Sequence, residues 1–447
     1  MNAEHQELLD RVQAARVDLI HLQFTSVPGT IKSLTIPASR LGRALEEGAW
    51  FDGSSIDGMA RLAESDLFLR PDPTTFATLP WERVPTARVI CDLGLPDGSS
   101  FLGDPRTALK TVLAEAADLG FEYRVACEVE FFVFEDRGED TMSGRSLVPV
   151  DRSGYFEVSG DRAGALCRAT SEALAGFGVE IEATHHEVAP GQHELDIADM
   201  GALAAADAIV ALKWAARALG RQNRLVVSFM PKPLESASGS GLHISQLLRR
   251  SATSGDVFFS PDDRYQLSEL GGQFVAGQLA HARGMCAVLA PLVNSYKRLT
   301  GGAEAPARVC WARTHRGALV RVPASSSPNS TRLELRAPDP SCNPYLALAV
   351  MLKAGLDGIA NGMALPEPVE ETWHLAAQEG GAEEEDQAGA LPRTLGEALE
   401  ELDWDPVVRE ALGQPIHERF LAAKEQEWAA FQHHISTWEL QRYLEGA

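Results

Sequence analysis

Cysteine is scarce in this sequence, with six among 447 residues, and no two of them form a CxxC pair. Disulfide frameworks and thiolate zinc sites need closely or regularly spaced cysteine pairs, so both are excluded here. We expect the six to be reduced packing residues of a cytoplasmic protein. They are Cys91, Cys127, Cys167, Cys286, Cys310 and Cys342.

The sequence is also short of basic residues and of long apolar runs. Lysine and arginine total 40 against 63 aspartates and glutamates, which gives a formal net charge of -23. Nucleic-acid binding needs a basic surface, so this charge argues against it. No apolar run reaches membrane-spanning length, and the first residues lack the basic start of a signal peptide. We therefore expect a cytoplasmic protein with no membrane contact and no direct nucleic-acid binding.

What the chain does contain is the composition of an ordinary folded protein, with 45% apolar and 23% charged residues. A chain of this length can bury a large core, and we expect a small domain followed by a large one. Asp104-Pro105 is typical of a helix start, and Gly120 of a helix end. We place the boundary there, which gives an α+β unit over residues 1–103 and a larger unit over 104–447.

Residue patterns predict the elements of both units. In the first, they predict a helix near 4–16, strands around 20–24 and 34–36, and a loop over 51–58. In the second, strand-like segments alternate with long helical stretches, which predicts a mainly antiparallel sheet flanked by helices. The strand-like segments are 123–134, 146–158, 180–197, 225–231, 241–247, 318–323 and 331–337. The helical stretches are 162–178, 200–220, 264–288, 344–361 and the tail from about 393, after an acidic segment (379–387) expected to be a mobile loop.

The most informative motif contains Glu128 and Glu130, two residues apart in an apolar run. In an extended strand, alternate side chains share a face, so both carboxylates point the same way. Two such anions about 4 Å apart repel by roughly 4 kcal/mol at an effective dielectric near 20. They need cations or protons, although a solvated strand face is the simpler alternative for this pair alone.

Other acidic residues and one histidine favour a metal site over that alternative. Glu187 and Glu194 flank a glycine-containing loop, and His243 follows the Gly-Ser-Gly of 239–241, where a backbone can approach a ligand closely. Carboxylates with a single histidine suit Mg²⁺ or Mn²⁺ better than a metal that prefers thiolates. Ions of this kind commonly accompany phosphates.

Arginines form the second half of the pattern. In the run from Arg332 to Arg336, the strand period of two places both arginines and Glu334 on one face. A surface ladder of salt bridges is the alternative, and it contributes little to stability. Guanidiniums aimed at phosphate and carboxylate oxygens, opposite metal-binding carboxylates, describe a phosphoryl-transfer site. The arginines concerned are Arg298, Arg313, Arg316, Arg321, Arg332 and Arg336.

Taken together and in order, these motifs resemble those of type I glutamine synthetases, almost from end to end of the chain. The matching segments are Phe51-Asp-Gly-Ser-Ser-Ile-Asp-Gly58, Glu128-Val-Glu130, His185-His-Glu187 through Glu194, Met230-Pro-Lys-Pro, Gly239-Ser-Gly-Leu-His243, Asn294-Ser-Tyr-Lys-Arg298, Glu304-Ala-Pro, Arg332-Leu-Glu334-Leu-Arg336 and Pro338-Asp-Pro-Ser-Cys-Asn-Pro-Tyr. So many ordered motifs are far more specific than a single glycine-rich loop.

The resemblance implies a small β-grasp-like N-terminal domain, a large catalytic domain, and two or more divalent ions per subunit, Mg²⁺ or Mn²⁺, with ATP as co-substrate. The implied metal ligands are Glu130, Glu187 and Glu194 for one ion, and Glu128, His243 and Glu334 for the other. Substrate glutamate would contact Gly239, Arg298, Arg316 and Arg336. The nucleotide would contact Glu182, Arg316, Arg321 and Arg332.

The resemblance also implies catalytic roles. Arg316 and Arg321 would stabilise the transferring phosphoryl group, and Glu304 would close over the intermediate. Asp52, supplied by the adjacent subunit, would take a proton from ammonium. Arg61 resembles the arginine of the feedback-inhibited branch whose members are not adenylylated.

The chain departs from the usual pattern close to these residues. Ser238 replaces an asparagine on the glutamate side, and Leu247 replaces a serine on the nucleotide side. His315 and Gly317 stand where asparagine and serine are common. The flap carries Gly-Gly-Ala over 301–303 in place of Pro-Gly-Tyr.

The resemblance leaves three functions open. The first is ligation of ammonia to L-glutamate, which Asp52 and Glu304 favour. The second is a γ-glutamyl-amine ligase acting on a primary amine or polyamine, which the small flap residues favour. The third is a nitrogen-sensing regulatory homologue with little catalysis. In each case a homo-oligomer, a dodecamer of two hexameric rings, is implied.

Overall fold

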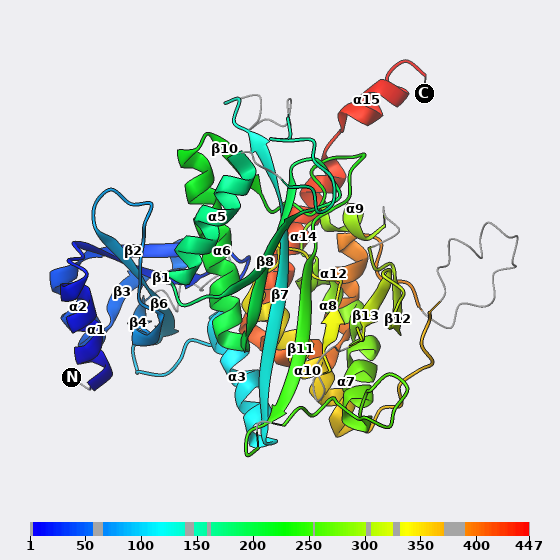
Figure 1. Ribbon diagram of the computed structural model, residues 1–447, viewed down its shortest axis with the longest axis horizontal. Helices are drawn as coiled ribbons and strands as arrows, with labels where there is room; N and C mark the ends of the chain where they lie inside the picture. The colour runs from blue at the N-terminus through cyan, green and yellow to red at the C-terminus, as the bar shows by residue number, and fades with distance from the viewer. Residues whose placement is uncertain are drawn as a thin grey trace, which may run out of the picture.

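A computed structural model of the chain describes residues 3–56, 66–138, 147–158, 162–253, 255–300, 305–324, 331–370 and 389–446. Figure 1 shows a small N-terminal unit beside a larger body, with helix α15 (Thr437–Tyr443) standing away from that body. No helix in this part of the chain has the length and apolar character that crossing a membrane requires.

The N-terminal unit is built on a mixed sheet of six described strands in the order β2-β1-β6-β4-β3, with β5 also paired to β6. Apolar side chains such as Ile20, Leu22 and Val89 form its core with helices α1 and α2. The helices are α1 (Ala3–Ala14) and α2 (Leu41–Glu47). The strands are β1 (Leu19–Thr25), β2 (Ile31–Pro37), β3 (Ala49–Asp52), β4 (Asp66–Pro71), β5 (Ala77–Thr78) and β6 (Thr86–Gly94).

The larger unit is built on eight described strands in the order β12-β13-β14-β11-β7-β9-β8, with β10 paired to β7. All neighbours pair antiparallel except β12 and β13. The predicted mainly antiparallel sheet and the α+β class are therefore confirmed. The strands are β7 (Phe121–Glu135), β8 (Ile181–His186), β9 (Gln192–Gly201), β10 (Leu225–Ser228), β11 (Leu242–Arg250), β12 (Arg308–Ala312), β13 (Ala318–Arg321) and β14 (Leu333–Leu335).

Helices cover one face of this sheet. Helix α6 packs on β7, β9 and β10, and the apolar helix α10 is buried along most of its length among α3, α6, α7, α8 and α13. The helices are α3 (Pro105–Asp118), α5 (Arg162–Ala175), α6 (Ala202–Gln222), α7 (Glu269–Ala280), α8 (Ala282–Leu289), α9 (Ser295–Leu299), α10 (Pro344–Ala360), α12 (Leu395–Trp404), α13 (Pro406–Leu412) and α14 (Gln414–His433).

The long strand β7 separates the core from the opposite face. Its odd-numbered residues Val125, Val129 and Val133 join the main apolar core, whereas Glu128 and Glu130 point to the other side. This alternation follows from the period of two in a strand. Around Glu128 and Glu130 the sheet therefore presents a polar face on the side away from the helices, while Phe132 and Phe134 form a separate apolar cluster further along the strand.

Buried ion pairs join the two units where helix α3 begins. The side chain of Asp104 caps α3 by accepting from the Arg106 N–H at 3.2 Å, as the sequence predicts. The Arg106 guanidinium donates to Asp72 at 2.8 Å and Asp92 at 2.7 Å in the small unit, and to Asp207 at 3.0 Å in α6. The domain boundary at 103/104 remains a prediction.

Several predicted elements were wrong in detail. The described part of the predicted strand 146–158 holds only one isolated pairing, between Phe134 and Pro149, because a turn follows and Phe156 adopts a φ of 59°. The predicted helix 264–288 starts only at Glu269 and is interrupted at His281. Strand β12 was missed, and the predicted loop at 51 begins as the end of β3. The acidic segment 379–387 lies outside the described residues.

Candidate active site

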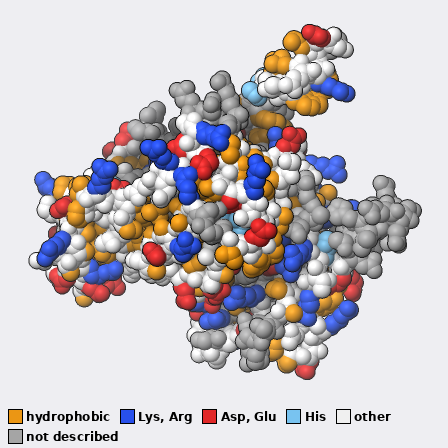
Figure 2. All heavy atoms as spheres, turned by 45° about the horizontal axis from the view of Figure 1, so that its top comes forward, with side chains coloured by type: hydrophobic (Ala, Val, Ile, Leu, Met, Phe, Trp, Pro, Cys, Tyr) orange, Lys and Arg blue, Asp and Glu red, His pale blue; other side chains and the backbone are white. Residues whose placement is uncertain are grey.

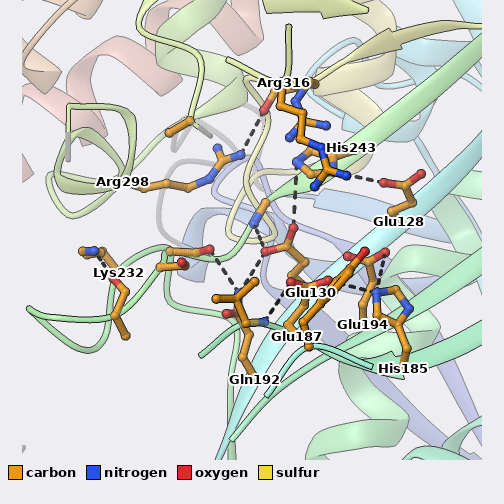
Figure 3. Close-up of a pocket in the computed structure, with 18 of the residues that line it drawn as sticks. Glu128, Glu130, His185, Glu187, Gln192, Glu194, Lys232, His243, Arg298 and Arg316 are labelled. Atoms are coloured by element: carbon orange, nitrogen blue, oxygen red, sulfur yellow. Dashed lines mark hydrogen bonds and ion pairs between the residues drawn. The ribbon is translucent and has the colours of Figure 1, made fainter. Parts of the chain in front are cut away.

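A cavity of about 840 Å³ opens on the polar face of the larger sheet. Figure 3 shows acidic side chains of β7 and β9 in it, with Arg298 and Arg316 entering from other segments. The predicted site residues that line it are Glu128, Glu130, Glu187, Glu194, Gly239, His243, Arg298, Arg316, Arg321, Glu334 and Arg336. The structure thus brings together residues that are more than two hundred positions apart in the sequence.

Strand register explains why these residues meet. Glu128 on β7 pairs with His243 on β11, and Glu130 pairs with Glu194 on β9. On the other side of β11, Ser245 pairs with Glu334 on β14. Side chains that lie opposite on one face of a sheet come within contact distance, so the ladder itself assembles the acidic cluster.

One of the two predicted metal-ligand sets forms a compact group. Ligand atoms of Glu128, His243 and Glu334 all lie within 4.8 Å of one another. His243 Nδ1 is 3.0 Å from a Glu128 oxygen, which holds the ring in place. Two carboxylates and one imidazole are a donor set that suits Mn²⁺ or Mg²⁺.

The other predicted set is arranged differently from what we expected. Glu187 and Glu194 do line the cavity, but the compact group found among the described residues is His185, Glu194 and Asp196. His185 Nε2 lies 2.9 Å from Glu187 and 3.7 Å from Glu194. His185 and Asp196 were therefore missed, although the period of two from Glu194 to Asp196 signals a shared face.

The carboxylates of the acidic cluster are buried close to one another, which disfavours their charged forms. Burial, with a contribution from the charge of Glu187, raises the pKa of Glu130 to about 7. Burial and the neighbouring charges of Glu130 and Glu128 also raise the pKa of Glu194 well above its ordinary value. Burial is likewise the main reason that the pKa of Asp196 rises to about 6. Carboxylates whose charges oppose one another in this way fit a site that binds divalent cations.

Arginines complete the opposite wall. Buried Arg298 donates to the backbone oxygens of Ala337 at 2.9 Å and of Arg336 at 2.9 Å, so its position is fixed by the chain. Glu334 accepts from Arg321 at 2.8 Å and also from Arg336. Guanidinium groups bind carboxylate and phosphate oxygens well, so this wall suits an anionic substrate.

The Gly-Ser-Gly segment is explained by close packing. A Cβ on Gly239 would lie 2.6 Å from the Pro231 oxygen, and one on Gly241 would lie 2.7 Å from both Arg298 and His243. The Gly241 N–H donates to Glu130 at 2.9 Å, so the backbone itself holds a carboxylate of the cluster. Larger residues are excluded here because the chain passes directly behind the site.

Several predicted residues lie away from the cavity. Asp52, Glu182 and Arg332 do not line it; Asp52 is exposed at the end of β3, where it accepts from the Ser54 N–H at 2.9 Å. Glu304 and Arg61 lie outside the described residues.

The positions at which the sequence departs from the family pattern differ in whether they line the cavity. Ser238 lines the cavity, whereas Leu247 is buried on β11 away from the lining. His315 is buried and accepts from the Gly317 N–H at 3.2 Å. Lining residues for which no role was predicted include Tyr155, His185, Gln192, Asp196 and Lys232.

Comparisons with known proteins show which family this chain is similar to. The glutamine synthetase beta-Grasp domain matches residues 16–96, and the glutamine synthetase catalytic domain matches residues 102–443. A glutamine synthetase of Methanosarcina mazei is 43% identical over 443 residues, which cover 98% of this chain and 97% of that protein. One of Thermus thermophilus is 43% identical over 446 residues, covering 98% of each chain.

Solved structures agree with these matches. A GmaS/ADP complex superposes with a TM-score of 0.85 at 28% identity, covering 98% of this chain and 99% of that one. The fold, the cavity and these relatives define an enzyme of the ligase class. The chain belongs to the glutamine synthetase family, and its N-terminal unit is the family's β-grasp domain.

Proposed function

We propose that the protein joins ammonia to the γ-carboxyl of L-glutamate with ATP, through γ-glutamyl phosphate, giving glutamine, ADP and phosphate. The observation that carries this proposal is the cavity in which Glu128, His243 and Glu334 converge beside Arg321 and Arg336. Carboxylates that can bind cations, opposite guanidiniums that can offset negative charge, are the groups that stabilise a phosphoryl group during its transfer. We also propose, from the ordered motifs of the sequence, that the chain belongs to the type I branch.

Divalent ions, Mg²⁺ or Mn²⁺, fit the carboxylates described above. Glu128, His243 and Glu334 would hold one, and the acidic group around Glu194 and Glu130, with Glu187, would hold another. When bound, such ions neutralise charge on phosphate oxygens and on the carboxylates themselves. The raised pKa values of Glu130 and Asp196 support this assignment, because both groups titrate near neutrality without a cation.

The chain's own residues account for the chemical steps. A carboxylate is a poor acyl donor. An oxygen of the glutamate γ-carboxylate therefore attacks the γ-phosphorus of ATP, ADP leaves, and an acyl phosphate forms. Arg298 and Arg336, with Gly239 behind them, would orient the glutamate, and Arg316 and Arg321 would offset charge on the transferring group. Glu182 and Arg332 are proposed on the nucleotide side.

The second step needs a neutral amine. Asp52 of a neighbouring subunit would take a proton from ammonium, and ammonia would then attack the acyl carbon and release phosphate. Glu304 is proposed to close over the intermediate and exclude water, which would otherwise hydrolyse it. Arg61 is proposed to respond to a feedback inhibitor.

The position of Asp52, which does not line the cavity of its own chain, supports the proposal of an oligomer. We infer a dodecamer of two hexameric rings with sites between neighbours. Figure 2 shows α15 projecting from the body with hydrophobic side chains on its surface. Trp438, Tyr443 and Leu444 there are exposed, as expected of a segment that docks on another subunit.

The alternative acceptor is a larger amine. Ser238 lines the cavity, and the small residues at 301–303 leave the flap without a bulky side chain. These features favour a γ-glutamyl-amine ligase using the same two steps.

A phosphate-release assay with mass analysis of the product separates the candidate functions. Wild-type protein with L-glutamate, ATP and Mg²⁺ is given ammonium, putrescine or no amine, with Glu334→Gln as the matched control. Glutamine formed with ammonium, and no product in the control, supports the proposal. Product with putrescine alone identifies the amine ligase, and no turnover with any amine identifies the regulatory homologue.

A further inference from the structure

A second polar cluster lies buried behind the acidic wall of the cavity. It contains Asp151, His186 and His193, whose side chains are only 7%, 1% and 2% exposed. Ligand atoms of all three lie within 4.8 Å of one another. No step of the proposed reaction uses these residues. Burying a carboxylate and two imidazoles costs free energy unless these groups are hydrogen-bonded.

Hydrogen bonds connect this cluster to the loop between β8 and β9. Asp151 accepts from His186 Nε2 at 2.7 Å and from the Gly191 N–H at 3.0 Å. His186 Nδ1 donates to the backbone oxygen of Glu187 at 2.6 Å. His193, one residue before Glu194, faces the second Asp151 oxygen at 3.3 Å. One carboxylate thus holds both ends of the loop that carries Glu187 and leads to Glu194.

The distances favour hydrogen bonds over a metal ion in this cluster. Two ligands bound to one tetrahedral ion at about 2.1 Å lie about 3.4 Å apart. His186 and Asp151 are 2.7 Å apart, which is a hydrogen-bond separation. The Glu187 carbonyl can only accept, so His186 Nδ1 donates to it, and His186 Nε2 lies within hydrogen-bond distance of the Asp151 carboxylate.

The loop has little freedom to relax if this support is lost. Gly191 adopts a φ of +69°, and a Cβ there would lie 2.8 Å from the Val133 oxygen of β7. The Val133 N–H donates to the Gly191 oxygen at 2.8 Å. The loop is therefore fixed at Gly191 by β7 and at Glu187 by His186, with Asp151 joined to both.

We propose that Asp151 is a positioning residue, which acts through His186 and Gly191 to hold Glu187 and Glu194 in the geometry that binds metal in the cavity. This role rests on the proposed function, because it requires a cation at those glutamates. Groups that orient metal ligands from behind typically change metal affinity or activity by about 10–100-fold when they are removed.

Mn²⁺ binding to the full-length protein tests this role. We expect Asp151→Asn to raise the Mn²⁺ dissociation constant about 10–100-fold and to lower kcat, and excess Mn²⁺ to restore part of kcat. His186→Gln should act in the same direction, which keeps the test valid if the first variant folds poorly. The matched control is His281→Gln, which removes a partly buried histidine held between two carboxylates, Asp357 and Asp405, far along the chain from this loop.

The outcomes are distinct. Weaker Mn²⁺ binding in Asp151→Asn but not in His281→Gln supports the positioning role. Unchanged Mn²⁺ binding in both Asp151→Asn and His186→Gln overturns the positioning role. An equal loss of Mn²⁺ binding in His281→Gln also overturns it, because the effect would then come from general stability. Wild-type protein that binds no Mn²⁺ overturns the proposed function, and the positioning role with it.

Discussion

At the scale of single residues, Glu334 is the point where the acidic and basic walls of the cavity meet. It accepts from Arg321 and Arg336 and belongs to the compact group with Glu128 and His243. A carboxylate shared in this way sets both the charge available to a cation and the direction of two guanidiniums. Burial raises the pKa of Glu128, and the positive charges of Arg336 and Arg321 oppose that rise.

Glu334→Gln should therefore inactivate the enzyme. Gln keeps the shape of the side chain but loses its charge, so we expect turnover to fall by more than about 100-fold. Removing a group that only orients a metal ligand already lowers metal affinity or activity about 10–100-fold. Steady-state kinetics at saturating Mg²⁺ and far-ultraviolet circular dichroism measure the effect. A folded variant with turnover near the wild-type value would contradict the metal assignment.

Ser238 gives a prediction of the opposite sign. It lines the cavity where the family pattern has asparagine. Ser238→Asn should restore one hydrogen bond to glutamate and lower its KM about fivefold, which corresponds to about 1 kcal/mol. Kinetics with varied glutamate test this, and the KM for ATP serves as the internal control. A raised glutamate KM would mean that this position does not face the substrate.

At the scale of elements, His281 joins the junction of α7 and α8 to helices α10 and α13. It interrupts the predicted helix 264–288 between α7 and α8, and its ring lies 2.8 Å from Asp405, which begins α13, and 3.1 Å from Asp357 of α10. Burial opposes the charge of the ring, but hydrogen bonds to both carboxylates outweigh it and raise the pKa of His281. The charged form is therefore the stabilising one.

Stability should depend on pH through this histidine. Its folded pKa lies above the unfolded value of about 6.5, so its contribution is complete below about pH 6.5 and is lost as the pH rises through the folded value. We expect His281→Gln to lower the free energy of unfolding below pH 6.5 and to approach the wild type at higher pH. Urea unfolding at several pH values measures the difference. A difference that grows with pH would contradict the sign.

The elements also show what the sequence could and could not predict. Alternation in 123–134 placed Glu128 and Glu130 on one face, because the period of two is local. The group of His185, Glu194 and Asp196 was missed because it depends on pairing between strands. A register irregularity between Ile181 and Ala183 sets His185 opposite Glu194, and no local pattern predicts that shift. The segment 146–158 was predicted as a strand, but its described residues make only one isolated bridge to β7, at Pro149.

At the scale of the whole molecule, the proposed reaction requires residues from more than one chain at each active site. Asp52 is exposed and does not line its own cavity, while the family resemblance gives it a catalytic role in the neighbouring subunit. The domain boundary was predicted from the helix start at Asp104-Pro105, whereas the assembly was predicted from that resemblance alone. A single sequence does not reveal an interface, because the charges and apolar residues of an interface resemble those of any other surface.

Mixed oligomers test the shared site. Asp52→Asn and Glu334→Gln subunits should each be inactive alone, but random mixing should give about a quarter of pockets with both groups intact. We expect activity to return when the two variants are co-expressed and to stay absent when each is expressed alone. Mixed oligomers, verified by mass spectrometry, that remain inactive would place Asp52 outside the neighbouring site.

The most direct test of the central claim is positional isotope exchange in ATP labelled with ¹⁸O at the β,γ-bridge. Reversible transfer of the γ-phosphoryl group to glutamate frees the β-phosphate to rotate, so the label scrambles without any amine present. We predict scrambling that requires L-glutamate and a divalent ion and that is absent in Glu334→Gln. An enzyme that forms its amide product yet shows no glutamate-dependent scrambling, under conditions where ADP stays bound and can rotate, would contradict phosphoryl transfer in this cavity.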